Sequence, residues 1–162
     1  MQPQQYTKGS QSDSSDNDHA ATINRSLTLM SYNVHGLIQG RPTIQQFIST
    51  VDILKLQEHW QTPANMCDKF SRLFPSHCAF GISALAERVE AGPLTGRPYG
   101  GVVTLLRNEL LSISEWLFTA ERLVIVRLSN ILLCNIYIPA VCWYSRSRSY
   151  LWCSCWIVRL DS

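Results

Sequence analysis

The stretch from Asp52 to Trp60, DILKLQEHW, is the feature that most constrains the fold of this chain. It is apolar for most of its length and then reaches a carboxylate, Glu58. If it forms a strand, Leu54, Leu56 and Glu58 lie on one face, because side chains alternate along a strand. Ligands of α/β sheets bind beyond the carboxyl ends of strands, which makes Glu58 a candidate binding residue. On this stretch alone, a solvated strand end explains Glu58 equally well.

The composition is that of a globular domain. The chain has 162 residues, 46% of them hydrophobic and 16% charged, and its net charge of +2 neither requires nor excludes nucleic acid. No apolar run reaches the roughly 18 residues that a membrane span needs, and a signal-peptide core is missing. We therefore expect a protein that is intracellular, not secreted, with free thiols at its six cysteines.

Three segments differ in composition. Residues 1–24 are polar and predict a disordered tail. Residues 25–139 carry the periodic patterns of a domain. Residues 140–162 hold three of the five tryptophans and three of the six cysteines, without a clear helix or strand period. We interpret this last segment as translation of DNA that was not selected to encode protein; the alternative is a basic, aromatic surface that contacts a membrane or nucleic acid.

Periodicity predicts an α/β or α+β domain with a mixed sheet. Gly36, Gly40 and Arg41-Pro42 indicate a loop, and two-residue hairpin turns are expected at 108–109 and 129–130. The order is β-α-β-α-β followed by an antiparallel meander. The expected strands are 26–34, 52–57, 77–83, 101–107, 112–118, 122–128 and 131–138, and the expected helices are 43–50 and 62–73.

Four stretches resemble a known family. They are SYNVHGL at 31–37, DILKLQEHW at 52–60, GRPYGGVVTLLR at 96–107 and NIYIP at 135–139. Together they are similar to motifs of the endonuclease/exonuclease/phosphatase superfamily, the DNase-I-like fold, and most similar to the endonuclease domain of non-LTR (LINE-type) retrotransposons. The resemblance covers roughly residues 25 to 139. It implies the N-terminal half of a four-layered α/β sandwich, cleavage of phosphoester bonds, DNA as partner and a nuclear location.

The resemblance also implies the site residues. Asn33 and Glu58 match family residues that ligate Mg²⁺ (Mn²⁺ as the alternative), and Tyr137 matches the tyrosine that contacts the scissile phosphate. Mg²⁺ prefers oxygen ligands and often takes one or two carboxylates, with waters completing its shell. No small-molecule cofactor is expected. The residues alone leave alternatives open, since Asn33 also suits a turn and Tyr137 also suits a core position.

Three further residues are candidates for substrate binding. Asn135 shares a strand face with Tyr137, and Arg97 and Tyr99 lie in an expected surface loop at 84–98. An arginine fork suits phosphate, although a surface arginine is usually only solvated. His59 follows Glu58, but strand alternation turns it to the opposite face, so we do not include it in the site.

Two family motifs are missing. The Asp-x-Asn motif and the C-terminal Ser-Asp-His do not occur, because after Pro139 the sequence has no Asp before Asp161 and no His. We therefore expect a truncated endonuclease domain that is inactive alone and that leaves an apolar sheet face exposed. The alternatives are a non-catalytic nucleic-acid-binding or interaction fragment, and a retroelement relic without function.

Overall fold

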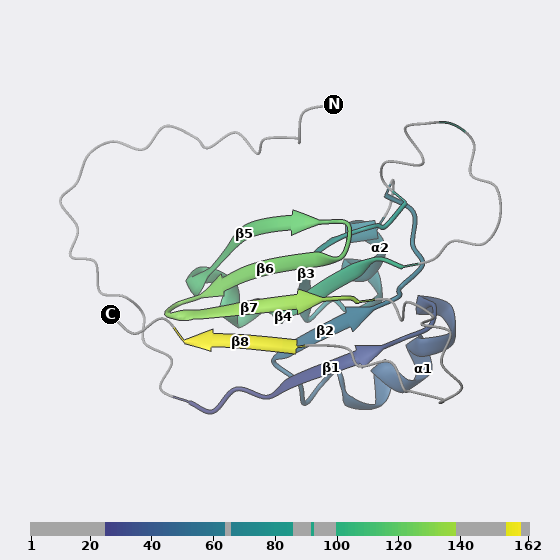
Figure 1. Cartoon of the computed structure of the whole chain (residues 1–162). Coiled ribbons are helices and arrows are strands. Elements are labelled where there is room, and N and C mark those ends of the chain that lie inside the picture. Colours follow the sequence, from purple (N-terminus) through teal and green to yellow (C-terminus); the bar gives the residue numbers. More distant parts are fainter. Residues whose placement is uncertain (1–24, 64–65, 86–91, 93–99, 139–154, 160–162) are drawn as a thin grey trace, which may run out of the picture.

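The structure is a computed structural model, and it describes residues 25–63, 66–85, 92, 100–138 and the backbone of 155–159. These residues form a mixed α/β fold with two four-stranded sheets and two α-helices (Figure 1). The predicted fold class, α/β with a mixed sheet, is confirmed. The predicted tail at residues 1–24 and most of the predicted loop at 84–98 lie outside the described residues.

The first sheet has the order β1-β2-β4-β3, and its two central strands are buried along almost their whole length. β1 (Leu29–Asn33) pairs with β2 (Ile53–Gln57) in parallel, and α1 (Leu37–Phe47) connects them. α2 (Met66–Leu73) then leads to β3 (His77–Ile82). β4 (Val102–Arg107) lies antiparallel between β2 and β3, which makes the sheet mixed.

The second sheet is antiparallel throughout, with the order β5-β6-β7-β8. β5 (Ser114–Ala120), β6 (Leu123–Leu128) and β7 (Ile131–Ile136) form the predicted meander, and the predicted turn at 129–130 joins β6 to β7. Ser129 there has a φ of 53°, as tight hairpin turns require.

Apolar alternation arranges the described elements in three layers. Leu54 and Leu56 of β2 are fully buried on the side of the sheet that faces Ile44 of α1 and Phe70 of α2. On the opposite side, Ile53 belongs to a second buried cluster with residues of β6 and β7. The two sheets therefore pack face to face, and both helices cover the far side of the first sheet (Figure 1).

The helix predicted at 43–50 begins earlier than expected. α1 starts at Leu37, so Gly40 and Pro42 lie inside the helix rather than in a loop. Gly40 is needed for close packing rather than for a turn, because a Cβ there would lie 2.7 Å from the Cβ of Val34. Only Gly36, with a φ of 100°, has the backbone of a turn residue.

The turn predicted at 108–109 is wrong. Residues Asn108–Ile113 form a 3-10 helix, η2, because β4 pairs with β2 and β3 and not with β5. The 3-10 helix carries the chain from the first sheet to the second. Local polarity marked the break between strands, but the sequence offered no sign that the next strand belongs to another sheet.

The backbone of Cys155–Arg159 forms β8, which pairs antiparallel with β7. The sequence analysis assigned no strand there. The interpretation of residues 140–162 as translation of DNA that was not selected to encode protein stays a prediction, because most of the segment lies outside the described residues. Within the described part of the chain, no helix has the length and apolarity for a membrane span. Cys67, Cys78 and Cys134 are free thiols.

β5 carries large apolar side chains that are exposed to solvent. The exposed sheet face that truncation would leave stays a prediction. Trp116, Leu117 and Phe118 are each about half exposed. Trp116 still makes an edge-on ring contact with Phe80 of the first sheet, at 6.3 Å between centroids. This contact ties the outer end of the second sheet to β3.

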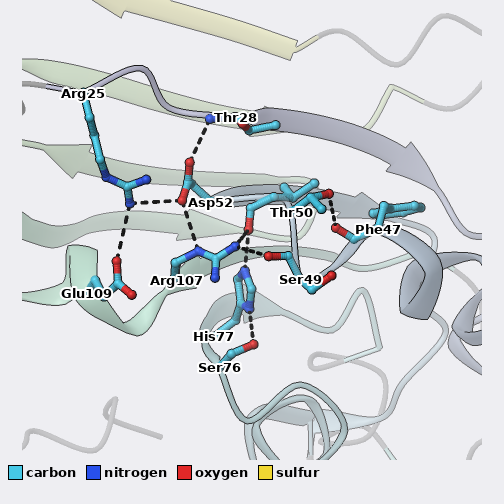
Figure 2. A network of polar contacts seen from close by, with 11 residues as sticks. Arg25, Thr28, Phe47, Ser49, Thr50, Asp52, Ser76, His77, Arg107 and Glu109 are labelled. Carbon is cyan, nitrogen blue, oxygen red and sulfur yellow. Dashed lines mark hydrogen bonds and ion pairs between the residues drawn. The ribbon is translucent and has the colours of Figure 1, made fainter.

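A buried carboxylate, Asp52, accepts hydrogen bonds from several segments at the end of the first sheet where β2 begins (Figure 2). Asp52 accepts hydrogen bonds from Arg25 at 3.0 Å, from Arg107 at 3.0 Å and from the Thr28 backbone N–H at 2.9 Å. Arg107 also donates to the carbonyls of Ser49 and Val51. Burial raises the pKa of Asp52, but the Thr28 and Arg25 hydrogen bonds and the two arginine charges lower it further, so its pKa falls below the usual value.

We expect Asp52→Asn to lower the free energy of unfolding by about 2–3 kcal/mol, because it leaves Arg107 without its carboxylate in a partly buried site. Urea unfolding at neutral pH measures the loss. The matched control is Glu121→Gln, whose pair with Arg122 is solvent-exposed and should contribute less than about 0.5 kcal/mol. Equal effects of the two substitutions would contradict a structural role for the Asp52 network.

Candidate functional site

The opposite end of the first sheet carries a cluster of left-handed backbone conformations. Glu58 directly follows β2 with a φ of 55°, and Trp60 has a φ of 56°. His35, with a φ of 45°, follows β1. The backbone N–H of Gly36 donates to the carbonyl of Glu58 at 2.8 Å, so the two segments are joined. Such conformations cost about 1–3 kcal/mol each in non-glycine residues and cluster at functional sites, which directs attention to this end of the sheet.

The three predicted catalytic residues meet at the Glu58 carboxylate. Asn33 Nδ2 donates to Glu58 Oε1 at 3.0 Å, and Tyr137 also hydrogen-bonds the carboxylate. His35 Nδ1 lies 3.0 Å from Glu58 Oε2. Asn33 ends β1, Glu58 follows β2 and Tyr137 follows β7, so both sheets contribute to the site.

The expectation that Glu58 shares a face with Leu54 and Leu56 is wrong. Leu56 faces the helices, whereas Glu58 reaches Asn33 and Tyr137, and Tyr137 packs against the core between the sheets. The positive φ of Glu58 ends the alternation and turns its side chain to the other side of the sheet. His59 in turn packs against Phe70 of α2, at 5.5 Å between ring centroids.

Glu58 is a carboxylate held in its charged form. Burial raises its pKa, but the hydrogen bonds from Asn33, Tyr137 and His35 and the His35 charge outweigh burial, so the pKa lies below the usual value. The side chain is 12% exposed, which leaves it within reach of a ligand from solvent. At neutral pH the site therefore presents one anionic carboxylate and one amide at the surface end of the inter-sheet core.

His59 supports the site from the buried side. Its Nδ1 accepts a hydrogen bond from the Gln61 N–H at 3.0 Å, which leaves Nε2 to donate to the Ile82 carbonyl at 3.1 Å. Burial lowers the pKa of His59 to about 4, against a smaller raising effect of the Ile82 bond. A Cβ on Gly101, which has a φ of 85°, would lie 2.4 Å from His59 Nε2. The last glycine of GRPYGG is therefore required by the packing of this histidine.

Asn135 lies close to the site but is fully buried between the sheets. Its Nδ2 donates to the carbonyls of Val103 at 2.9 Å and Leu56 at 3.3 Å, and its Oδ1 accepts from Gln57 Nε2 at 2.7 Å. These bonds occupy its amide with protein partners. Asn135 thus holds β7, and with it Tyr137, against the first sheet, whereas its role in substrate binding stays a prediction.

The other predicted residues divide into two groups. Arg97 and Tyr99 lie outside the described residues. His35, by contrast, was not singled out from the sequence, although it contacts Glu58 and is 66% exposed. Its position between Asn33 and Gly36 in SYNVHGL was the available signal.

The donor set suits a hard divalent cation only in part. Glu58 and Asn33 offer carboxylate and amide oxygens, which Mg²⁺ accepts together with several waters. The Asn33 Oδ1 accepts from the His35 N–H at 3.2 Å, so its oxygen points toward the same turn. Among the described residues, no group of three His, Cys, Asp or Glu side chains is arranged to hold a metal. The pair fits a metal that keeps most of its water shell.

Comparisons with known proteins give a distant structural match. No family model and no curated protein matches the chain. Among solved structures, 43 chains match, one of them the 3′ phosphatase NExo from Neisseria bound to product DNA hairpin. That match has 17% identity and a TM-score of 0.44, and it covers 69% of this chain and 41% of the other. The chain thus spans less than half the length of that protein, and a likeness this distant carries no inference about activity.

Acidification should destabilise the protein through His59. The unfolded chain binds this proton near pH 6.5 and the folded chain only near pH 4, so stability rises with pH across that window and falls on acidification. From the two pKa values, we expect His59 to remove about 2 kcal/mol of stability between pH 7.5 and pH 5. Urea unfolding at both pH values measures the difference.

The matched variant is His59→Asn, which does not titrate. Burial also lowers the pKa of His77, so His77 contributes in the same direction in both proteins. The variant should therefore lose about 2 kcal/mol less than the parent on acidification. The same pH dependence in parent and variant would contradict the assignment of a buried, neutral His59.

Proposed function

We propose that the chain carries the metal- and phosphate-binding part of a phosphodiester hydrolase site that acts on DNA, of the kind found in LINE-type endonucleases, which its motifs resemble. The observation that carries the proposal is that Asn33 and Tyr137, which come from different sheets, both hydrogen-bond the Glu58 carboxylate. A solvated strand end would not bring Tyr137, which follows β7 of the second sheet, to Glu58.

Each residue has a role that follows from its chemistry. Glu58 and Asn33 would hold Mg²⁺, with Mn²⁺ as the alternative, and such an ion polarises a phosphoryl oxygen and offsets charge on the leaving group. The Tyr137 hydroxyl is both acceptor and donor, so it can bond a phosphate oxygen when the ion neutralises Glu58. His35 orients the Glu58 carboxylate from the exposed side.

The same site lacks groups that hydrolysis requires. It has one carboxylate, whereas the family resembled adds an Asp-x-Asn and a Ser-Asp-His motif, and neither occurs in the sequence. Catalytic groups that act as a unit are strongly non-additive, so the absence of several removes nearly all activity. We therefore propose binding of metal and DNA backbone without efficient cleavage by this chain alone.

Metal binding should depend on Glu58. We expect Mn²⁺ to bind the full chain in a titration followed by electron paramagnetic resonance. Glu58→Gln should weaken this binding at least tenfold, because it removes the one carboxylate that the described residues contribute to the site. The isosteric glutamine keeps the hydrogen-bonding shape of the side chain. Circular dichroism verifies that the variant is folded.

The control for metal binding is Glu115→Gln, which removes an exposed carboxylate from β5 that pairs with Arg127. It should leave Mn²⁺ affinity within twofold. Equal affinity in the parent and in Glu58→Gln would refute a metal role for Glu58, and equal losses in both variants would point to non-specific charge attraction.

Plasmid nicking tests the catalytic half of the proposal. With Mg²⁺, we expect no nicking of supercoiled plasmid above the level of Glu58→Ala or of an EDTA control, because the acid–base partners are missing. Nicking that needs both Mg²⁺ and Glu58 would show that another group of the chain supplies proton transfer, and the chain would then be an active nuclease.

A further inference from the structure

A groove crosses the helix layer beside the candidate site. It consists of two adjoining cavities of about 420 and 370 Å³ that share Lys69 and Leu73 of α2. Gln61 borders one cavity, and Ile38 and Arg41 of α1 border the other. We call this feature the α1–α2 groove.

The charge of the groove is one-sided. Arg41, Lys69 and Arg72 line it, and no carboxylate does. Arg41 makes no hydrogen bond or ion pair with any described residue, Lys69 donates to the Gln61 amide oxygen, and Arg72 donates to the Asp68 backbone carbonyl. The groove therefore holds three cations whose charges no described side chain neutralises.

The other described cations are used differently. Each of the remaining arginines with a described side chain pairs with a carboxylate, and Lys55 is buried between the sheets, where it donates to the Cys134 carbonyl. These paired arginines are Arg25, Arg107, Arg122 and Arg127. The arginines that form no ion pair with a described carboxylate, Arg41 and Arg72, are thus gathered with Lys69 in one groove.

The groove also has apolar lining residues, which can contact an apolar part of a ligand in addition to an anionic group. Ile38 is 75% exposed, the highest exposure among the large apolar side chains described, and it lines the groove with Leu37, Pro42 and Leu73. Cations beside exposed apolar side chains match a strand that alternates phosphates with bases, since nucleic-acid grooves combine backbone neutralisation with apolar contact to the bases.

The groove is continuous with the site through the backbone. Gln61 lies three residues after Glu58, which is at most about 11 Å of chain. Leu37, which lines the groove, donates its N–H to the His59 carbonyl at 3.0 Å, and Gln61 Nε2 donates to the same carbonyl at 3.0 Å. One short segment thus presents Glu58 to the candidate site and Gln61 to the groove.

We propose that the α1–α2 groove binds one strand of nucleic acid, with Arg41, Lys69 and Arg72 on its phosphates and Ile38 against its bases. The inference rests on the proposed function only in taking the strand to be DNA; the groove requires neither the metal nor Glu58.

Binding of a fluorescein-labelled single-stranded dT12 oligonucleotide to the full chain, followed by anisotropy in EDTA, tests the proposal. Arg41→Gln and Arg72→Gln should each weaken binding about fivefold at 0.1 M salt, and together about 25-fold. For single strands, each phosphate contact multiplies the binding constant by roughly the molar salt concentration to the power −0.7, which is about five at 0.1 M. The double variant should also lower the salt slope by about 1.4. Both side chains are exposed, so the variants are expected to fold, which thermal unfolding verifies.

Three controls make the result decisive. Arg127→Gln removes the same charge from the second sheet and should change affinity less than twofold. Glu115→Gln, which removes an exposed carboxylate from β5, should bind dT12 within twofold of the parent. Because the binding is measured in EDTA, a failure of the proposed metal site leaves the groove result unaffected. Ile38→Ser should weaken dT12 binding severalfold and leave binding of inorganic polyphosphate unchanged, since polyphosphate has no bases.

Several results would overturn the proposal. Absence of dT12 binding, or equal losses in Arg127→Gln and Arg41→Gln, would show that the groove cations do not contact a strand. An Ile38→Ser variant that binds dT12 like the parent would reduce the groove to a general anion site. Groove-dependent binding of vesicles with anionic lipids, without binding of dT12, would assign it to a membrane surface.

Discussion

The candidate site depends on the backbone of Glu58. A left-handed residue at the end of β2 ends the strand alternation and directs the carboxylate toward Asn33 and Tyr137 instead of toward the helices. This conformation is unfavourable for glutamate, and the surrounding contacts maintain it. Among them are the Gly36 bond to the Glu58 carbonyl and the packing of His59 under Gly101. Without that turn, Asn33 and Tyr137 would have no common partner.

Two carboxylates bracket β2 and have opposite uses. Asp52 precedes the strand and pairs with Arg25 and Arg107. Its charge is therefore neutralised within the protein, and the two ion pairs join the segment before β1 to the end of β4. Glu58 follows the strand and is held by an amide, a phenol and an imidazole, none of which carries a permanent charge. Arg41, Lys69 and Arg72, which form no ion pair with a described carboxylate, lie in the α1–α2 groove instead. This separation leaves the Glu58 charge available to an external cation and the groove charges available to an anionic strand.

Much of the fold and part of the site could be predicted from sequence. Alternation located β2, β4, β6 and β7, and the helical period predicted α2 and the C-terminal part of α1. Misassigned features had non-local causes. Gly40 serves helix packing against Val34, and the break after β4 is a change of sheet. Glu58 was identified through its motif, but the face it occupies depends on a φ angle that alternation cannot predict. The groove cations escaped notice because Arg41 and Lys69 are distant in sequence.

The central claim is that Asn33 and Tyr137 stabilise the charged form of Glu58. The most direct measurement is the pKa of the Glu58 side-chain carboxyl, by carbon-13 NMR of the metal-free protein in EDTA, in the parent and in the Asn33→Ala and Tyr137→Phe variants. The account predicts a pKa below the usual value of about 4.3 in the parent and a higher pKa in each variant. A parent pKa at or above that value, unchanged by both substitutions, would contradict the convergence on which the site is built.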